Sequence, residues 1–225
     1  MSPPIHLGVM QVELDHLFVC TAAGGPEAQR LLQFGLNEAP PNVHPGQGTA
    51  NRRFAFSNAM IELLWVDNPA EAQSQATART LLWERWSRRS EGSCPFGICV
   101  RPVDIPPTAP PFPGWEYRPV YLPPPLSMHI GEAGVEEPMW VYLNFITRTQ
   151  RQKWFHEHSS DIQEITRVVL HTPVPVSSSA ARRLVEAGVV HTEPSAGYAL
   201  EIEFDHNRKG QRIDLGPDLP VVLRL

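Results

Sequence analysis

Cysteine and long apolar runs are both scarce in this chain of 225 residues. Only three cysteines occur, Cys20, Cys94 and Cys99, and an odd, small count does not provide the disulfide framework of a secreted domain. No run of residues reaches the roughly 18 apolar residues that a membrane-spanning helix needs. The first residues, MSPPIHLGVMQ, lack the basic and apolar regions of a signal peptide. We therefore expect a cytoplasmic protein with free thiols.

A strong charge of one sign is also missing. The formal net charge is −5, which gives no reason to expect nucleic acid or an anionic membrane as a partner. The length allows one large domain or two small ones. The partners that we expect are a small-molecule substrate or ligand and, at most, a second copy of the chain in a homodimer.

The first segment, 13–66, predicts strand, helix, loop, strand and strand. A strand over 13–21 precedes a helix that begins near Pro26 and ends at Gly35, where proline at a helix start and glycine after its end are both favoured. A loop rich in Pro, Gly and Asn covers 37–50. Two strands follow, at 51–56 and 59–66.

The middle segment, 67–160, predicts one helix followed by strands. Asn68, Pro69 and Glu71 form a strong helix start, and we expect this helix to reach about Arg88. Ten prolines between positions 102 and 125 exclude a helix there. The expected strands are 96–101, 116–121, 127–130 and 139–146. The polar stretch 148–160 is interpreted as a linker that leaves His156 and His158 solvated.

The last segment, 161–225, echoes the first. EITRVVLHTPVPVSSSAARRLVEAGVV from Glu164 aligns with ELDHLFVCTAAGGPEAQRLLQFGLN from Glu13, and ALEIEFD aligns with MIELLWV, which places Glu201 on Glu62. The second copy lacks the loop around NVHPGQGTAN. Since function concentrates on loops held by a rigid scaffold, that loop is a candidate for function. The predicted whole is one compact α+β domain.

The strongest pointer to function is a pair of ionisable residues on two apolar strand faces. Because strand side chains alternate, His16 shares a face with Leu14, Phe18 and Cys20, and Glu62 shares one with Met60 and Leu64. A histidine and a carboxylate buried in apolar surroundings need a partner. Each other, a metal ion or a bound ligand can serve.

Three further residues are candidates for the same site. His44 lies in the added loop, where it can be a third ligand or a general acid or base. Asn51 can orient a substrate oxygen or end the turn. Arg167 can form a structural bridge with Glu201, or it can recognise a carboxylate or phosphate of the ligand.

Taken together, LDH at 14–16, HPGQGTANR at 44–52 and IELLWV at 61–66 resemble the vicinal oxygen chelate superfamily, in its glyoxalase-like branch. The resemblance implies βαβββ modules paired into a curved mixed sheet or incomplete barrel with a cupped cavity. In this chain an inserted helix and a Pro-rich central segment would interrupt that plan. The resemblance also implies a divalent transition metal (Zn, Fe, Mn, Ni or Co), with His16 and Glu62 at ligand positions.

The chain departs from that pattern in its second module. If the last segment supplies the partner module, Arg167 stands where His16 stands in the first, and an arginine does not ligate metal. If the central segment supplies it, Ile98 takes that position. Two functions therefore stay open, beside a degenerate structural protein in which the polar pair survives only as a hydrogen bond. One is a metal-dependent lyase, isomerase or dioxygenase, with His16, Glu62 and His44 around the metal and His44 and Glu62 in catalysis. The other is a metal-free protein that binds or sequesters a small molecule.

Overall fold

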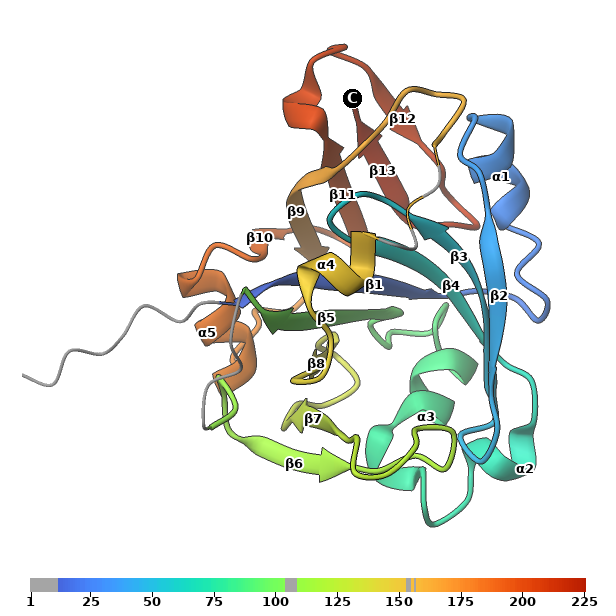
Figure 1. The fold of residues 1–225 in the computed structure, drawn as a ribbon, viewed down its shortest axis with the longest axis vertical. Coiled ribbons are helices and arrows are strands. Elements are labelled where there is room, and N and C mark those ends of the chain that lie inside the picture. The colour runs from blue at the N-terminus through green and yellow to red at the C-terminus, as the bar shows by residue number, and fades with distance from the viewer. Residues whose placement is uncertain (1–11, 104–108, 153–154, 156) are drawn as a thin grey trace, which may run out of the picture.

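The protein consists of two mixed β-sheets with short helices, as a computed structural model that describes residues 12–103, 109–152, 155 and 157–225 shows (Figure 1). The first sheet has eight strands and contains every described strand up to position 142. The second sheet has five strands and lies in the last quarter of the chain, above the first in the view of Figure 1. The predicted α+β class is confirmed.

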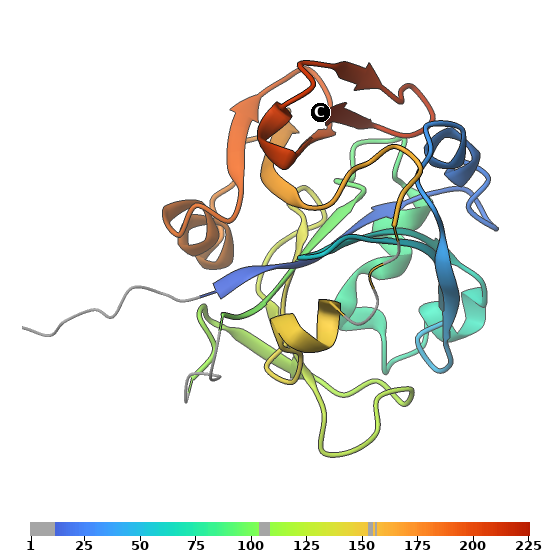
Figure 2. The ribbon, with the colours of Figure 1, turned by 45° about the horizontal axis from the view of Figure 1, so that its top comes forward.

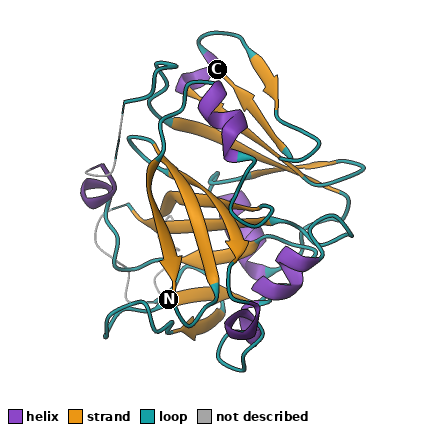
Figure 3. Cartoon of the chain, turned by 90° about the vertical axis from the view of Figure 1, so that its right-hand side faces the viewer, coloured by secondary structure: helices purple, strands orange, loops and turns teal. Residues whose placement is uncertain are grey.

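The larger sheet is curved and open. Its eight strands, in spatial order, are β2 (Ala39–His44), β3 (Thr49–Ala55), β4 (Met60–Val66), β1 (Val12–Cys20), β5 (Phe96–Pro102), β8 (Met139–Tyr142), β7 (Met128–Gly131) and β6 (Gly114–Tyr117). Since β2 and β6 are both edge strands, the sheet does not close into a barrel. Figure 3 shows its curvature. The predicted incomplete barrel is therefore confirmed.

The two halves of this sheet repeat one pattern. β1 pairs with β4 in parallel, β5 pairs with β8 in parallel, and β1 and β5 meet as antiparallel neighbours at the centre. The central segment is therefore the partner of the first module. In the β1–β5 register, His16 lies opposite Cys99. Cys99, and not Ile98, is the counterpart of His16 in the second half.

The last segment forms its own sheet rather than a copy of the first module. Its strands, in spatial order, are β10 (His191–Pro194), β9 (Ile165–Thr172), β11 (Ala199–Phe204), β13 (Val221–Arg224) and β12 (Arg212–Asp214). The repeat holds for a strand followed by a helix, α1 (Ala28–Gln33) in the first copy and α5 (Ser179–Glu186) in the second. Beyond the helix the pairing differs, because β11 is antiparallel to β9 whereas β4 is parallel to β1. The alignment of Glu201 with Glu62 therefore does not correspond to equivalent places in the fold.

The main core lies between the two sheets (Figure 2). Alternate residues of the large sheet face it, including Leu17, Ile61 and Ile98, and they pack in one cluster with Leu170 and Leu223 of the small sheet. The opposite face of the large sheet carries a second, smaller cluster that includes Phe18 and Leu64. The small sheet thus covers one face, which leaves the other face to form a pocket.

The helix predicted over 68–88 is wrong beyond its first turn. It begins as expected, with the Asn68 side chain accepting hydrogen bonds from the backbone of Ala70 and Glu71, but α2 (Pro69–Ala72) ends after four residues. A 3₁₀ turn, η1 (Ala78–Thr80), and α3 (Leu82–Ser87) follow. The Thr77 hydroxyl bonds the carbonyls of Glu71 and Ala72, so the side chain replaces the backbone partners that a continuous helix requires.

Two stretches predicted as irregular contain structure. The loop predicted over 37–50 includes edge strand β2, and the polar linker includes α4 (Arg148–Gln152). His158 is buried rather than solvated: its Nδ1 accepts the Asn37 backbone N–H at 2.9 Å, and its ring packs against Phe56 at a tilt. His156 lies outside the described residues. A 3₁₀ turn, η2 (Asp205–Asn207), follows β11.

Candidate functional site

His16 is aimed into the pocket by an irregularity in β1. The β1–β5 register shifts between Leu14 and His16, so Asp15 is an extra residue in the ladder. Leu14 therefore packs with the main core, and it does not share the face of His16 as the alternation predicts. Asp15 is buried and holds His16: its Oδ1 lies 2.6 Å from His16 Nδ1, and its Oδ2 accepts from Arg101 at 2.8 Å. Because a carboxylate bonded to arginine accepts hydrogen bonds, His16 Nδ1 is the donor.

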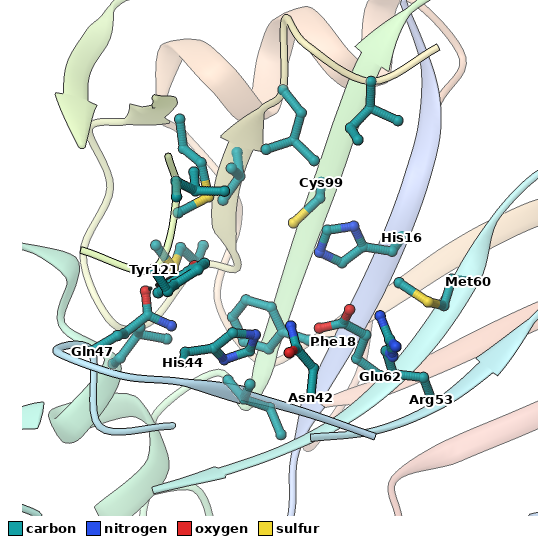
Figure 4. A pocket seen from close by; sticks show the side chains of 18 of the residues that line it. His16, Phe18, Asn42, His44, Gln47, Arg53, Met60, Glu62, Cys99 and Tyr121 are labelled. Atoms are coloured by element: carbon teal, nitrogen blue, oxygen red, sulfur yellow. Dashed lines mark hydrogen bonds between the residues drawn. The ribbon is translucent and has the colours of Figure 1, made fainter. Parts of the chain in front are cut away.

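Glu62 reaches the same pocket from β4. The alternation of MIELLWV is as predicted, because Met60, Glu62 and Leu64 line the pocket while Ile61 and Leu63 join the main core. Glu62 is buried, with 8% of its surface exposed. Figure 4 shows its carboxylate facing into the pocket between His16 and His44. The sequence prediction that His16 and Glu62 converge on one hollow agrees with this placement.

His44 enters from the end of edge strand β2 and is fixed by its neighbours. Its Nδ1 lies 2.9 Å from Thr49 Oγ1, which also accepts a hydrogen bond from Gln47 Nε2 at 2.8 Å. The ring of Tyr121 stacks against it, with 4.8 Å between ring centroids. The tight turn at 45–48 is held from α2, because the Gly46 N–H donates to Glu71 Oε2 at 2.6 Å. The loop picked out by the sequence does carry a histidine into the pocket.

These residues share a cavity of about 210 Å³ that is polar at one end and mostly apolar over the rest of its wall (Figure 4). The volume is smaller than the roughly 300–1,000 Å³ of typical drug-sized sites, which indicates a small ligand. The polar end consists of His16, Asn42, His44, Gln47, Arg53 and Glu62. The remaining wall consists of Phe18, Met60, Leu64, Leu82, Cys99, Tyr121, Leu122, Met128, Met139, Val141, Leu143, Phe145, Ile146 and Gln150.

The two histidines of the pocket have opposite electrostatic environments. Burial alone lowers the pKa of His16, but the nearby Cys99 and Glu62 and the hydrogen bond to Asp15 outweigh it and hold that pKa well above its ordinary value. Burial lowers the pKa of His44, and the charges of His16 and Arg53 add to this effect against that of Glu62. At neutral pH, His16 is therefore an imidazolium and His44 is a neutral imidazole.

Arg53 and Cys99 are among the pocket residues that sequence reasoning missed. Arg53 lies directly opposite Glu62 in the β3–β4 register, and its Nε donates to the Pro40 carbonyl at 2.7 Å. The run RR at 52–53 holds the signal, because consecutive strand residues face opposite sides. Arg52 bonds Glu38 on the outside, whereas Arg53 lines the pocket. Predicting Cys99 would have required the order of the strands, because no local sequence pattern links Cys99 to His16.

The structure separates the other two predicted residues from the pocket wall. Asn51 is fully buried beneath the wall: its Oδ1 accepts the backbone N–H of Asn42, and its Nδ2 has no hydrogen-bond partner. Arg167 is exposed on β9 and lines a different hollow, together with Asn58 and Arg148. The bridge predicted between Arg167 and Glu201 is not formed, because Glu201 pairs with Arg224 at 3.2 Å and Arg167 lies across from Glu203.

The side chains do not fit the metal that the resemblance implies. Across the described parts of the chain, no three His, Cys, Asp or Glu side chains gather in a way that could hold a metal ion. The pocket also contains the guanidinium of Arg53 directly opposite Glu62, and a cation there competes with a metal ion for that carboxylate.

Comparisons with known proteins identify the family. A family model described as "Glyoxalase-like domain" matches residues 14–188, so the chain belongs to the glyoxalase-like family, a branch of the vicinal oxygen chelate superfamily. No curated protein matches the chain. Among solved structures, a hypothetical protein from Staphylococcus aureus has the same fold, with a TM-score of 0.57 and 11% identity over 95% of this chain and 98% of that one. At that identity the likeness shows the fold alone. No helix of the described residues has the length and apolar character to cross a membrane.

Proposed function

We propose that this protein binds a small amphipathic carboxylate in the pocket and does so without a metal ion. The observation that carries the proposal is the division of one cavity into a polar end and an apolar wall. Carboxylate-bearing metabolites with a short hydrocarbon chain match that division, because the chain leaves water while the head keeps charged partners.

The charges at the polar end favour an anion. His16 and Arg53 are cations and Glu62 is an anion, so the ionisable residues that line the cavity leave one positive charge in excess. The neighbouring buried acid Asp15 pairs with Arg101, which also pairs with Glu13, and Glu13 pairs in turn with Arg148, so these two acids are matched by two arginines. Arginine suits carboxylates because its N–H groups form two parallel hydrogen bonds to the two oxygens. Asn42 and Gln47 add neutral amide groups at the same end.

Binding of hexanoate and of hexanol, which have the same chain but different heads, tests the proposal. We expect hexanoate to bind more tightly, and Arg53→Gln to weaken hexanoate by roughly ten- to a hundredfold, the equivalent of a lost charged hydrogen bond. Arg52→Gln is the matched control, since that neighbouring arginine pairs with Glu38 outside the pocket. Isothermal titration calorimetry measures all four affinities. Equal binding of the two compounds, or equal losses in the two variants, contradicts the proposal.

The same titration separates this proposal from metal-dependent function. Purified protein is titrated with hexanoate after dialysis against a chelator and again after addition of Zn²⁺ or Ni²⁺. We expect the same affinity in each case. Binding that appears only with the metal, together with one equivalent of metal lost in His16→Ala, restores the metal-dependent alternative.

One observation also favours catalysis by proton transfer at this site. His16 and His44 share a pocket and have pKa values shifted in opposite directions, an arrangement that provides an acid and a base at one pH. We propose that one of the two bases, His44 or Glu62, takes a proton from the carbon next to a ligand carbonyl and later returns it to that carbon, while His16 stabilises the oxygen of the enolate that forms in between. Deuterium uptake from D₂O into 2-oxohexanoate, followed by NMR, tests this. Uptake that persists at the same rate in His44→Gln and Glu62→Gln opposes it.

A further inference from the structure

One row of residues crosses the large sheet from the charged end of the pocket to its apolar end. Followed through the strand registers from β3 to β8, the row consists of Arg53, Glu62, Phe18, Gly97 and Met139. The four members that carry a side chain all line the cavity. A hydrocarbon chain that runs from a carboxylate at Arg53 toward the apolar residues of β8 therefore passes Phe18.

The ring of Phe18 lies over Gly97 and fills the place that a side chain at that position would take. A Cβ on Gly97 would lie 1.9 Å from Phe18 Cε1, 2.3 Å from Cζ and 2.4 Å from Cδ1. The backbone of Gly97 is that of an ordinary strand residue, so this close approach requires the size of glycine and not its conformational freedom. Figure 4 shows Phe18 beside Glu62 on the pocket wall. The ring is thus seated where the charged end meets the apolar end.

We propose that Phe18, seated over Gly97, sets the length of hydrocarbon chain that the pocket accepts. The inference rests on the proposed binding of amphipathic carboxylates and adds which members of that class bind. The cavity of about 210 Å³ holds only a small ligand, and the ring occupies the strip between Glu62 and Met139. Because protein interiors are close-packed, a chain that reaches the ring can extend no further unless the ring is smaller or moves.

Two variants should change the accepted length in opposite directions. Phe18→Leu replaces the ring with a smaller side chain, so longer chains should fit. Gly97→Ala places a methyl group where the ring lies. The three atoms nearest to that methyl group all belong to Phe18, so the ring has to leave its seat. The backbone of β5 and the side chain of Glu62 flank the ring, and the cavity is the space into which it can move. Shorter chains should then be the limit.

A series of straight-chain carboxylates from butanoate to nonanoate, measured by isothermal titration calorimetry, tests the proposal. The affinity of the wild type should rise about fourfold for each methylene that leaves water, and it should stop rising at a limiting length. We expect this limiting length to be at least about one carbon longer in Phe18→Leu and at least about one carbon shorter in Gly97→Ala, each a change of about fourfold for the chain at the limit.

Phe54→Leu is the matched control for the loss of a buried ring. Phe54 is also buried, but it belongs to the main core on the opposite face of the sheet. This variant should be less stable and have the limiting length of the wild type. An unchanged limiting length in folded Phe18→Leu overturns the proposal, and so does an equal shift in Phe54→Leu. If Gly97→Ala does not fold, Phe18→Leu still decides.

The corresponding alcohols, from butanol to octanol, separate this inference from the proposed function. Equal affinities for acids and alcohols of the same length contradict carboxylate binding, whereas a limiting length that moves with Phe18 in both series still supports the role of the ring. A preference for acids with one limiting length in all variants leaves carboxylate binding in place and overturns the role of the ring. Absence of binding of either series to the wild type overturns both.

Discussion

His16 and His44 show how neighbours decide the state of a residue. Both are imidazoles in one cavity, yet Asp15 and Glu62 favour charge on His16, whereas burial and the His16 and Arg53 charges disfavour it on His44. Each shift is also a contribution to stability that changes with pH. The two contributions have opposite signs.

We predict opposite pH profiles for two variants. The raised pKa of His16 contributes stability that is complete below its unfolded pKa, near 6.5, and is lost as pH rises through its folded pKa. His16→Gln should therefore cost most free energy of unfolding at about pH 6 and less at about pH 9. The pKa of His44 is lower in the folded than in the unfolded state, so below about pH 6.5 the unfolded state binds the proton more readily. Protonation of His44 therefore lowers the free energy of unfolding as the pH falls. His44→Gln should remove this loss of stability in acid.

Urea unfolding at several pH values measures both profiles. The measured quantity is the free energy of unfolding of the wild type minus that of the variant. This difference should fall with rising pH for His16→Gln and rise with pH for His44→Gln. Parallel profiles for the two variants would show that the two histidines do not differ in the folded state.

Whether a pocket residue could be predicted from the sequence depended on whether its strand is regular at that position. Glu62 followed from strict alternation in β4, where every second residue faces the pocket. His16 was aimed correctly, but its partner was not found, because Asp15 faces the ring only through the bulge in β1. An extra residue in a ladder depends on the neighbouring strand, so the sequence of β1 alone does not contain it.

At the scale of elements, the turn that delivers His44 depends on close packing against α2. Gly48 has φ +74°, and a Cβ at this position would lie 2.3 Å from the Asn68 carbonyl oxygen and 2.6 Å from the Ala72 nitrogen. Both atoms are backbone, so they cannot move aside cheaply. Glycine is therefore required twice here, for its conformation and for its size.

We predict that Gly48→Ala destabilises the protein by more than the roughly 1–2 kcal/mol that the left-handed backbone alone costs. Gly24→Ala is the matched control, because Gly24 has φ +80° but has no atom within 4 Å of the added carbon. Urea unfolding compares the two variants, and the NMR shifts of His44 report whether the turn has moved. Equal losses in both variants would show that the contact with α2 is unimportant.

The elements themselves were predictable where local chemistry decides. Asn68 and Pro69 correctly marked the start of α2. The end of that helix was not predictable from periodicity, because the Thr77 hydroxyl binds backbone carbonyls. Similarly, β2 is an edge strand with four exposed residues in its six, and exposed polar strands resemble loops in sequence.

At the scale of the whole molecule, Asn58 joins the two sheets. It lies in the turn between β3 and β4, and its side chain makes two hydrogen bonds to Ile165 on β9: Nδ2 donates to the carbonyl at 2.7 Å, and Oδ1 accepts the N–H at 2.9 Å. Arg101 Nη2 donates to the backbone oxygen of Asn58 at 2.7 Å. One residue thus connects the small sheet to the buried charges behind His16.

We predict that Asn58→Ala lowers the free energy of unfolding by about 1–3 kcal/mol, because two backbone groups of Ile165 lose their partners. Since the main core takes residues from both sheets, unfolding should remain a single transition. Ser57→Ala is the control, because Ser57 contacts Gln163 through its backbone N–H. Circular dichroism and tryptophan fluorescence, recorded together, check the result. Two separate transitions would contradict the shared core.

The arrangement of the whole was the part least accessible to the sequence. The repeat between Glu13 and Glu164 onward reflects a strand followed by a helix, which two unrelated units can share. The partner of the first module is the Pro-rich central segment, whose strands carry no helix between β5 and β6 in the described residues. Strand order arises from pairing between distant segments, and the pairing of His16 with Cys99 depends on it.

The bulge at Asp15 has a consequence for how relatives of this chain diverge. Most point mutations upstream leave the direction of His16 unchanged, because the backbone path fixes it. Loss of the single codon at position 15 would instead restore regular pleating, leave Leu14 and His16 on opposite faces as they are now, and remove the carboxylate that orients the imidazole. The carboxylate that orients the imidazole is therefore expected to be gained and lost among relatives by one-residue insertions and deletions as well as by changes in residue type.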